Sequence, residues 1–249
     1  MTSQRLITIP FSHYAEKSRW MLDRAKEPYE EIGRLPLYHM LETVPRGGRS
    51  VPMFVQQDGH VLRDSLDITS MLDAKHPDLR LYPKDPQGRA QARALEVMLG
   101  ERLGPAVRLA VYATILPEFE TYRSYFGKQG SALDQKTFRL TWRAWWAALN
   151  KAMKPSQGRF ERNVARIQDV FDEVQPLLDS KSHAYLFDEV PGAADLTLAA
   201  LAVPLIGPAQ YAHSVMPPEE APAQWQEVIE RFRAHPVGQY VQKLYADHR

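Results

Sequence analysis

The sequence of 249 residues predicts an α/β domain followed by an all-α domain. Three observations predict this order. Short β-rich runs alternate with segments of helical spacing as far as Lys75. A polar, proline-rich stretch follows at residues 77–86, and every later periodic segment has the period of a helix. We therefore expect a first domain at residues 1–76, a linker at 77–86 and an all-helical domain at 87–249.

The first half of the α/β domain reads as strand, helix and strand. Residues 6–9 form a short β-rich run, which predicts the first strand. Residues 14–27 carry apolar side chains at helical spacing, and Pro28 ends that helix. Residues 29–32 predict a second strand, and the less regular residues 35–44 suggest a short helix within a loop.

The second half of this domain reads as a β-hairpin and a helix. Strand patterns at residues 51–55 and from Val61 flank an Asp58-Gly59 turn, which is typical of a hairpin. Residues 66–75 then place their apolar side chains on one helical face. A βαβ unit followed by a hairpin and a helix is the thioredoxin-like arrangement, a mixed sheet with helices on its faces.

The remainder of the chain predicts a bundle of helices. The first is long and should kink at Gly104-Pro105, because proline removes a backbone donor and clashes with the preceding turn. The strongly apolar segment at 192–205 should be the buried central helix. The expected helices lie at residues 88–115, 133–153, 163–178, 192–205, 222–234 and 237–246.

Composition excludes several classes of function. The net charge is +1, so neither nucleic acid nor an anionic membrane surface is an expected partner. The chain has no cysteine, which excludes disulfides, thiolate metal sites and cysteine nucleophiles. Its eight histidines show no metal-ligand spacing, so we expect no metal. No apolar run is long enough to span a bilayer, and we expect a cytoplasmic protein.

Two residue pairs of the α/β domain suit a small peptide with a free carboxylate. If the Val51–Pro52 bond is cis, it holds the backbone amide and carbonyl of Val51 outward, free to pair with a ligand. Asp64-Ser65 stands at a helix N-terminus, where unpaired N–H groups favour an anion. One pair offers a peptide-like edge and the other an anion site.

These motifs resemble those of cytosolic glutathione transferases. Residues 10–20, Pro-Phe-Ser-His-Tyr-Ala-Glu-Lys-Ser-Arg-Trp, resemble the active-site loop and first helix of that family. The Val51-Pro52 and Asp64-Ser65 pairs resemble its glutathione-binding motifs. Residues 192–200 resemble its buried-helix capping motif, with Gly192 as a weaker cap in place of the usual Ser or Thr. The resemblance covers essentially the whole chain and indicates a serine-type, bacterial-like member of the glutathione S-transferase superfamily.

The resemblance implies an enzyme that uses glutathione as co-substrate, attacks a small hydrophobic electrophile and forms a homodimer. Ser12 would be its catalytic residue, because a hydroxyl that donates to the glutathione thiolate stabilises the anion beside a helix N-terminus. The alternative is that Ser12 only caps the helix. The expected glutathione-binding residues are Arg49, Val51, Pro52, Asp64 and Ser65.

Further candidates each have two interpretations. Tyr14 could supply a second hydroxyl at the sulfur, or be part of the wall or core. The arginines of residues 46–49 could hold the glycyl carboxylate of glutathione, or be solvated surface. The tryptophans of residues 142–146 favour a core or interface over a ligand cage. The candidate residues of the electrophile pocket are Tyr14, Met98, Arg102 and Tyr112.

Two classes of function stay open at this stage. The first is a glutathione transferase that activates the thiol for attack on an electrophile. The second is a catalytically weak or inactive scaffold of the same fold that binds a protein partner. A glutaredoxin-like thiol transferase is disfavoured, because it needs a cysteine at the position of Ser12.

Overall fold

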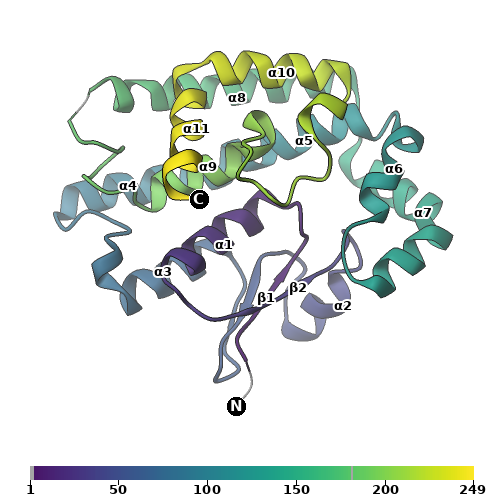
Figure 1. Ribbon diagram of the computed structural model, residues 1–249, viewed down its shortest axis with the longest axis horizontal. Helices are drawn as coiled ribbons and strands as arrows, with labels where there is room; N and C mark the ends of the chain where they lie inside the picture. The colour runs from purple at the N-terminus through teal and green to yellow at the C-terminus, as the bar shows by residue number, and fades with distance from the viewer. Residues whose placement is uncertain (1–2, 181) are drawn as a thin grey trace.

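The computed structural model describes residues 3–180 and 182–249. Figure 1 shows a small sheet at the base of the molecule, helices α1 and α3 above it, and the remaining helices stacked over and beside them. The chain begins at the sheet and ends close to α1. Among the described residues, no helix is long and apolar enough to cross a membrane.

The predicted thioredoxin-like sheet is present. Its strands are β1 (Arg5–Thr8), β2 (Glu30–Gly33), β3 (Met53–Val55) and β4 (Val61–Leu62), in the spatial order β2-β1-β3-β4. β1 pairs parallel with β2 and antiparallel with β3, and β3 pairs antiparallel with β4. Strand β3 begins after Pro52, because proline cannot donate to the ladder.

The two faces of the sheet bury different residues. Leu6 and Phe54 point to the side of α1 (His13–Arg24) and α3 (Ser65–Lys75) and belong to the main core. Ile7, Met53 and Val55 point to the opposite side and form a separate small cluster. This is the alternation expected of neighbouring residues along a strand.

The connection from β2 to β3 supplies one wall of the site described below. It holds the expected short helix, α2 (Met40–Thr43), and then the 3₁₀ turn η1 (Val44–Arg46). The Val51–Pro52 bond is cis, which is the condition stated above for an outward-facing Val51 backbone. The hairpin turns at Gly59, whose positive φ of 88° is a conformation that glycine adopts without strain.

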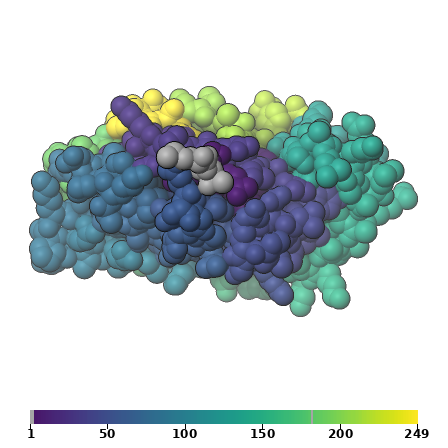
Figure 2. Space-filling view, turned by 90° about the horizontal axis from the view of Figure 1, so that it is seen from below, coloured from purple at the N-terminus to yellow at the C-terminus, as the bar shows by residue number. Residues whose placement is uncertain are grey.

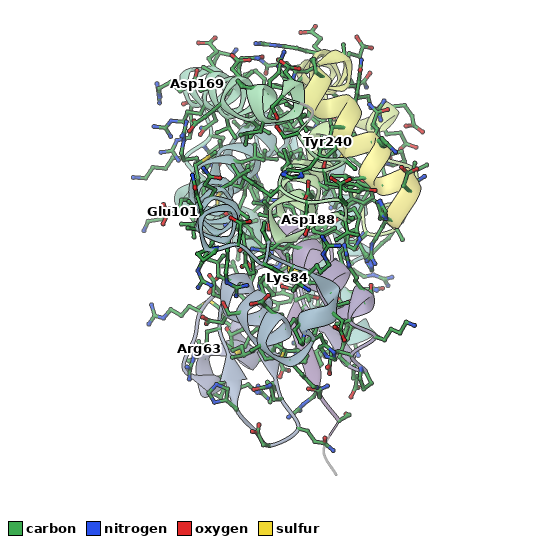
Figure 3. The ribbon with its side chains drawn as sticks, turned by 90° about the vertical axis from the view of Figure 1, so that its left-hand side faces the viewer. Arg63, Lys84, Glu101, Asp169, Asp188 and Tyr240 are labelled. Atoms are coloured by element: carbon green, nitrogen blue, oxygen red, sulfur yellow. The ribbon has the colours of Figure 1, made fainter. Side chains whose placement is uncertain are left out.

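The segment between α3 and α4, which joins the α/β part to the helical part, is anchored to the helices. It holds the 3₁₀ turn η2 (Pro77–Leu79), and the Arg80 guanidinium pairs with the Asp188 carboxylate. The carbonyl of Leu81 accepts a hydrogen bond of 2.7 Å from the Ala193 amide. Figure 3 shows Lys84, in the same segment, where the α/β part below meets the helices above.

The helical part contains every predicted helix and one that was not predicted. The long first helix is interrupted, as expected, but by a π-helical turn that precedes Gly104-Pro105 rather than by a simple kink. The helices are α4 (Pro86–Met98), the π-helical turn η3 (Leu99–Leu103), α5 (Gly104–Ile115), α6 (Phe119–Gly127), α7 (Ala132–Met153), α8 (Gln157–Asp179), α9 (Ala193–Ile206), α10 (Ala223–Ala234) and α11 (Pro236–His248), with the 3₁₀ turn η4 (Pro218–Glu220) before α10.

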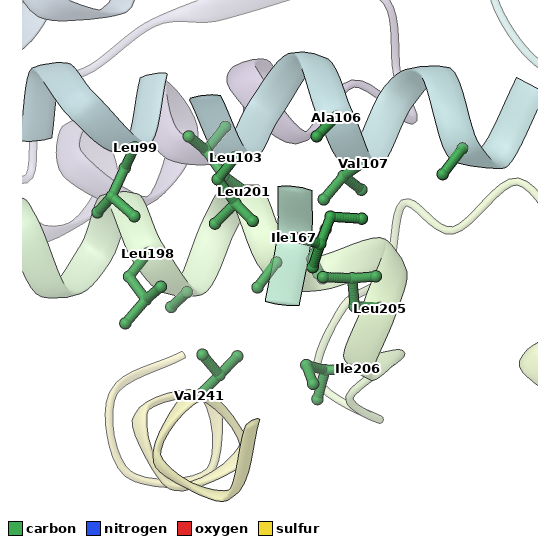
Figure 4. Close-up of a cluster of buried hydrophobic side chains, with 14 of the residues drawn as sticks. Leu99, Leu103, Ala106, Val107, Ile167, Leu198, Leu201, Leu205, Ile206 and Val241 are labelled. Carbon is green, nitrogen blue, oxygen red and sulfur yellow. The ribbon is translucent and has the colours of Figure 1, made fainter. Parts of the chain in front are cut away.

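Helix α9 is the buried centre of the molecule, as the sequence predicted. Its neighbours include α1, α4, α5, α10 and α11. Figure 4 shows leucines of α9 packed beneath apolar residues of the continuous segment α4–η3–α5. Side chains of α8 and α11 complete the cluster. The residues of this cluster include Leu99, Leu103, Val107, Ile167, Leu198, Leu201, Leu205 and Val241.

The start of α9 is capped by its own aspartate. The Asp195 carboxylate accepts hydrogen bonds from the amides of Gly192 (2.7 Å) and Leu186 (3.0 Å) and from the Tyr240 hydroxyl. Gly192 offers no side-chain cap, but a Cβ there would lie 2.8 Å from the Leu81 carbonyl oxygen. The close approach of that carbonyl therefore explains the glycine.

Helix α7 holds the loop that follows β2. The Asp134 carboxylate accepts from the Arg34 guanidinium and from the Leu35 amide at 2.9 Å. The Trp145 indole donates to the Pro36 carbonyl at 2.7 Å. Figure 1 and the view from below in Figure 2 show α6 and α7 standing beside the first domain. Trp145 is 3% exposed, so this tryptophan belongs to the core, as favoured.

Candidate active site

A cavity of about 370 Å³ lies between the first domain and the helices. One wall consists of the turn between β1 and α1, the Pro36–His39 loop and residues 49–51. The opposite wall comes from α5, from the end of α7 and from the segment after α9. Most of the lining is apolar, and its polar side chains are few. The arrangement is typical of a site for a small ligand.

Ser12 lies at this cavity, at the start of α1. Its Oγ accepts a long hydrogen bond of 3.4 Å from the Ala15 amide, so it caps the helix as the alternative interpretation held. Among the described residues, its hydroxyl donates to no acceptor. The hydrogen is therefore available to an anion in the cavity, and the helix N-terminus favours the same charge. Capping and anion stabilisation are compatible in this geometry.

Tyr14 also lines the cavity, but its hydroxyl is committed elsewhere. It donates to the carbonyl of Gly100 at 2.6 Å. Burial raises the pKa of Tyr14 to about 12, with a smaller opposing effect from Arg108 and a further increase from Asp64. The tyrosine is thus a neutral wall residue that joins the two parts of the molecule.

The π-helical turn explains why the Gly100 carbonyl is free for this bond. The Gly104 amide reaches back five residues to the Leu99 carbonyl, as in a π-helix. The next residue, Pro105, has no N–H and leaves the Gly100 carbonyl without a helical donor. The Tyr14 hydroxyl fills that place. A Cβ on Gly104 would lie 2.2 Å from the same hydroxyl, so only glycine permits the approach.

His13 is a buried neutral imidazole at the cavity wall. Its side chain is 6% exposed, and its ring lies 4.8 Å from the Tyr14 ring. The pKa of His13 is lowered to about 3, chiefly by burial and in part by the positive charge of Arg108, while the Gly104 backbone acts in the opposite direction. Among the described residues, its Nε2 has no hydrogen-bond partner.

The first-domain wall brings together Arg49, Val51 and His39. The His39 Nε2 lies 3.0 Å from the Arg49 carbonyl oxygen and fixes this segment beside the loop. The Arg49 side chain is exposed at the cavity and has no hydrogen-bond or ion-pair partner among the described residues. Arg46, by contrast, is engaged by the backbone carbonyl and carboxylate of Glu42. Of the two arginines considered from sequence, Arg49 is the one free to bind an anion.

Asp64 and Ser65 stand at a helix N-terminus, as predicted. Asp64 caps α3, and its carboxylate accepts from the Leu66 amide at 2.8 Å. Ser65 is the first residue of that helix and is buried. Neither residue is among those that line the cavity, whereas Val51, beside Pro52, is.

The candidates for the electrophile pocket separate into two groups. Tyr14 and Tyr112 line the cavity, and Met98 and Arg102 are not among its lining residues. The Arg102 guanidinium pairs with the Glu173 carboxylate at 2.6 Å, which directs it toward α8. The structure instead brings Arg108 to the cavity from the middle of α5.

Sequence reasoning missed several residues of the site, and His39 and Arg108 are two of them. Arg108 is the one charged residue in the described helix Gly104–Ile115, and a lone charge on an apolar helix is a detectable signal. His39 offered no comparable signal, because its place at the cavity depends on the path of the loop after β2. Among the described residues, no group of side chains could hold a metal ion.

The comparisons with known proteins agree with this geometry. Residues 6–83 match the family described as glutathione S-transferase, N-terminal domain. A stretch of 79 residues is 38% identical to a probable maleylacetoacetate isomerase from Caenorhabditis elegans, and it covers 32% of this chain. The chain thus spans only about a third, 36%, of the length of that curated relative.

Solved structures extend the likeness to the full length of the chain. The glutathione transferase GSTFuA3 of Phanerochaete chrysosporium is similar, with a TM-score of 0.63, 17% identity and coverage of 100% of this chain and 98% of its own. A glutathione S-transferase of Ceriporiopsis subvermispora, in complex with glutathione, is similar with a TM-score of 0.62 and 18% identity, and the two chains are covered to the same extents. At such identities the likeness shows the fold. Residues 6–83 thus match the N-terminal domain family of glutathione S-transferases, and the whole chain, with its cavity at Ser12, has the fold of glutathione transferases.

Proposed function

We propose that the protein is a glutathione transferase in which Ser12 stabilises the thiolate of bound glutathione. The observation that carries the proposal is the Ser12 hydroxyl, which faces the cavity at a helix N-terminus and has its hydrogen unused. Free thiols of this kind have a pKa of about 8.5 and are mostly protonated at neutral pH. A donated hydrogen bond favours the charged form and increases the fraction of nucleophile.

Glutathione would lie along the first domain. The backbone of Val51, beside the cis Pro52, is proposed to pair with the cysteinyl unit; among the described residues, no backbone hydrogen bond engages Val51. The free Arg49 guanidinium suits the glycyl carboxylate. Asp64 and Ser65, at the start of α3, suit the ammonium and carboxylate of the γ-glutamyl end.

The electrophile would occupy the helical side of the cavity. There the bound thiolate attacks an electrophilic carbon, and the apolar wall excludes water from the reaction. The curated relative is a probable maleylacetoacetate isomerase, but the match covers 36% of it, and its reaction is not proposed for this chain. The homodimer implied by the family stays a proposal.

The test is the ionisation of the bound thiol. One charge-assisted hydrogen bond contributes roughly 1.5–3 kcal/mol, which corresponds to a pKa lower by about one to two units. Thiolate absorbance in the ultraviolet, recorded against pH with saturating glutathione, should show this decrease in the wild type. Ser12→Ala should lose it while keeping the fold and most of the affinity for glutathione.

Ser12→Thr is the matched control, because it keeps the hydroxyl and should keep the low pKa. The rate of conjugation at pH 7 should fall in the alanine variant and recover as the pH rises. Identical titration curves for wild type and Ser12→Ala would mean that Ser12 is a helix cap only. The catalytically inactive scaffold would then be the better interpretation.

A further inference from the structure

The charged side chains that line the cavity are all positive. Arg49 and Arg108 are the cations among its lining residues, and no aspartate or glutamate lines it. The rest of the helical wall is apolar, with Val111, Ile115 and Met153 among its side chains. A cleft lined by one sign of charge and by apolar walls attracts a ligand of the opposite sign.

Arg108 is uncompensated within the protein. Among the described residues it has no hydrogen-bond or ion-pair partner, although its charge helps to lower the pKa of His13 and opposes the rise that burial causes in the pKa of Tyr14 and Tyr112. Arg102, six residues earlier, is paired with Glu173. Arg108 is an exposed residue that lines the cavity, so its charge keeps its hydration until a ligand arrives.

The anionic groups of glutathione do not account for Arg108. Under the proposed function, Arg49 and the start of α3 take the two carboxylates, and Ser12 takes the thiolate. All three belong to the first domain, whereas Arg108 lies on α5 in the opposite wall. Tyr112 follows one helical turn later at the same wall.

We propose that the second substrate is an electrophile with a carboxylate or a similar anionic group, and that Arg108 binds that group. The proposal rests on the proposed function and names its substrate class. Arginine suits the task because its planar donors can bind a carboxylate in a bidentate manner. The apolar body of the substrate would lie against Val111, Ile115 and Phe126, with its reactive carbon toward Ser12.

A matched pair of probes tests this assignment. The probes are 4-chloro-3,5-dinitrobenzoate and its methyl ester. In both, the glutathione thiolate forms a carbon–sulfur bond, the carbon–chlorine bond breaks and chloride leaves, while the thiol proton passes to solvent. Rates are divided by those of free glutathione with each probe, which removes the difference in intrinsic reactivity.

We expect the wild type to prefer the carboxylate by about tenfold or more in normalised kcat/KM, the effect of one good charge-assisted contact. Arg108→Gln should remove that preference, mainly by raising KM for the carboxylate. The normalised kcat/KM for the ester should change by less than about twofold. Arg108→Lys should restore part of the preference. Arg102→Gln is the control on the neighbouring turn and should behave as the wild type.

A binding measurement separates this proposal from the proposed function. The two S-conjugates can be prepared chemically and their affinities measured by calorimetry, which needs no catalysis. Tighter binding of the carboxylate conjugate that is lost in Arg108→Gln supports the assignment even if Ser12 proves inactive. Equal affinities for both conjugates in the wild type, or an equal loss for both in Arg108→Gln, would overturn it.

Discussion

At the scale of single residues, the surroundings of His13 give the protein a specific response to acid. The ring is almost fully buried, and burial holds its pKa near 3. In the unfolded chain the same group titrates near 6.5. Between these values the unfolded state binds the proton and the folded state does not, so protonation favours unfolding as the pH falls.

We therefore expect His13→Gln to flatten the pH dependence of stability. The wild type should lose about 2 kcal/mol of unfolding free energy from this residue between pH 7 and pH 5. His213 and His248 also have pKa values lowered by burial, but they titrate alike in both proteins and cancel in the comparison. Urea denaturation at pH 7, 6 and 5 measures the difference. Parallel curves for the two proteins would contradict the prediction.

The residues of the site were predictable where a motif fixes their place in the chain. Ser12 and the Asp64-Ser65 pair stand at helix starts, and local capping chemistry places them there whatever surrounds them. The lone charge of Arg108 on an apolar helix marks it as a candidate, but the sequence does not show whether Arg108 or Arg102 faces the cavity. Both arginines belong to the continuous helical segment from α4 to α5. Which of them faces the cavity depends on how this segment packs against α8 and the first domain.

At the scale of elements, the contact between α7 and the loop after β2 positions the first-domain wall. Asp134 is 1% exposed and holds both the Arg34 guanidinium and the Leu35 amide. The loop then runs through Leu37 to His39, which both line the cavity. A helix that belongs to the second part of the chain thus supports residues of the first.

Asp134→Ala should release this loop. The change leaves the Leu35 amide without a partner and removes one of the two carboxylates, Asp134 and Glu42, that pair with the largely buried Arg34 guanidinium. Losses of this kind cost about 1–3 kcal/mol. Hydrogen exchange of residues 35–39 should become faster, and glutathione affinity should fall. The control is Asp169→Asn, an exposed aspartate of α8 that projects away from the molecule in Figure 3. Unchanged hydrogen exchange of residues 35–39 in the Asp134→Ala variant would contradict the prediction that Asp134 holds this loop.

Most elements followed from apolar periodicity, and the failures have local causes. Helix α6 was missed although Phe119, Tyr122 and Phe126 have helical spacing, since the segment is short and Gly127 ends it. Helix α8 begins at Gln157 rather than near residue 163, because Ser156 caps it and accepts from the Arg159 amide. The π-helical turn has no signature in the apolar pattern, and a kink was the nearest expectation.

At the scale of the whole molecule, a buried ion pair joins the two parts. The Lys17 ammonium of α1 lies 2.7 Å from the Glu96 carboxylate of α4, and both side chains are at most 1% exposed. The Tyr82 hydroxyl donates to the same carboxylate. Three residues after Lys17, the Trp20 indole donates to the carbonyl of His248 at 3.1 Å, and at the end of α1 the Arg24 guanidinium donates to the carbonyl of Pro191. The first helix is thus held by the helical part along its length.

We expect the protein to unfold as one unit, and this pair to be strongly coupled. Lys17→Met leaves the Glu96 carboxylate buried without its cation, which should cost about 3–5 kcal/mol. The double variant Lys17→Met with Glu96→Gln should recover much of that loss, because no charge remains to be compensated. Denaturant unfolding followed by tryptophan fluorescence and by circular dichroism measures both effects. Separate transitions, or additive single effects, would contradict the expectation.

These contacts lie beyond what sequence alone can predict. The division into an α/β part and a helical part followed from periodicity and from the proline-rich segment after Lys75. The pairing of Lys17 with Glu96 joins residues far apart in the chain, and no local pattern marks either as a buried charge. The homodimer expected from the family likewise stays a prediction.

The π-helical turn before α5 sets which side of that helix each of its residues faces. Such a turn holds one residue more than an α-helical turn would, and each residue advances an α-helix by about 100°. Deleting one residue between Leu99 and Leu103 would swing Arg108 and Tyr112 away from the cavity and bring their neighbours into it. A one-codon insertion or deletion in this turn could therefore exchange the helical wall of the cavity without substituting any residue of α5, which offers evolution a short route between substrates on one scaffold.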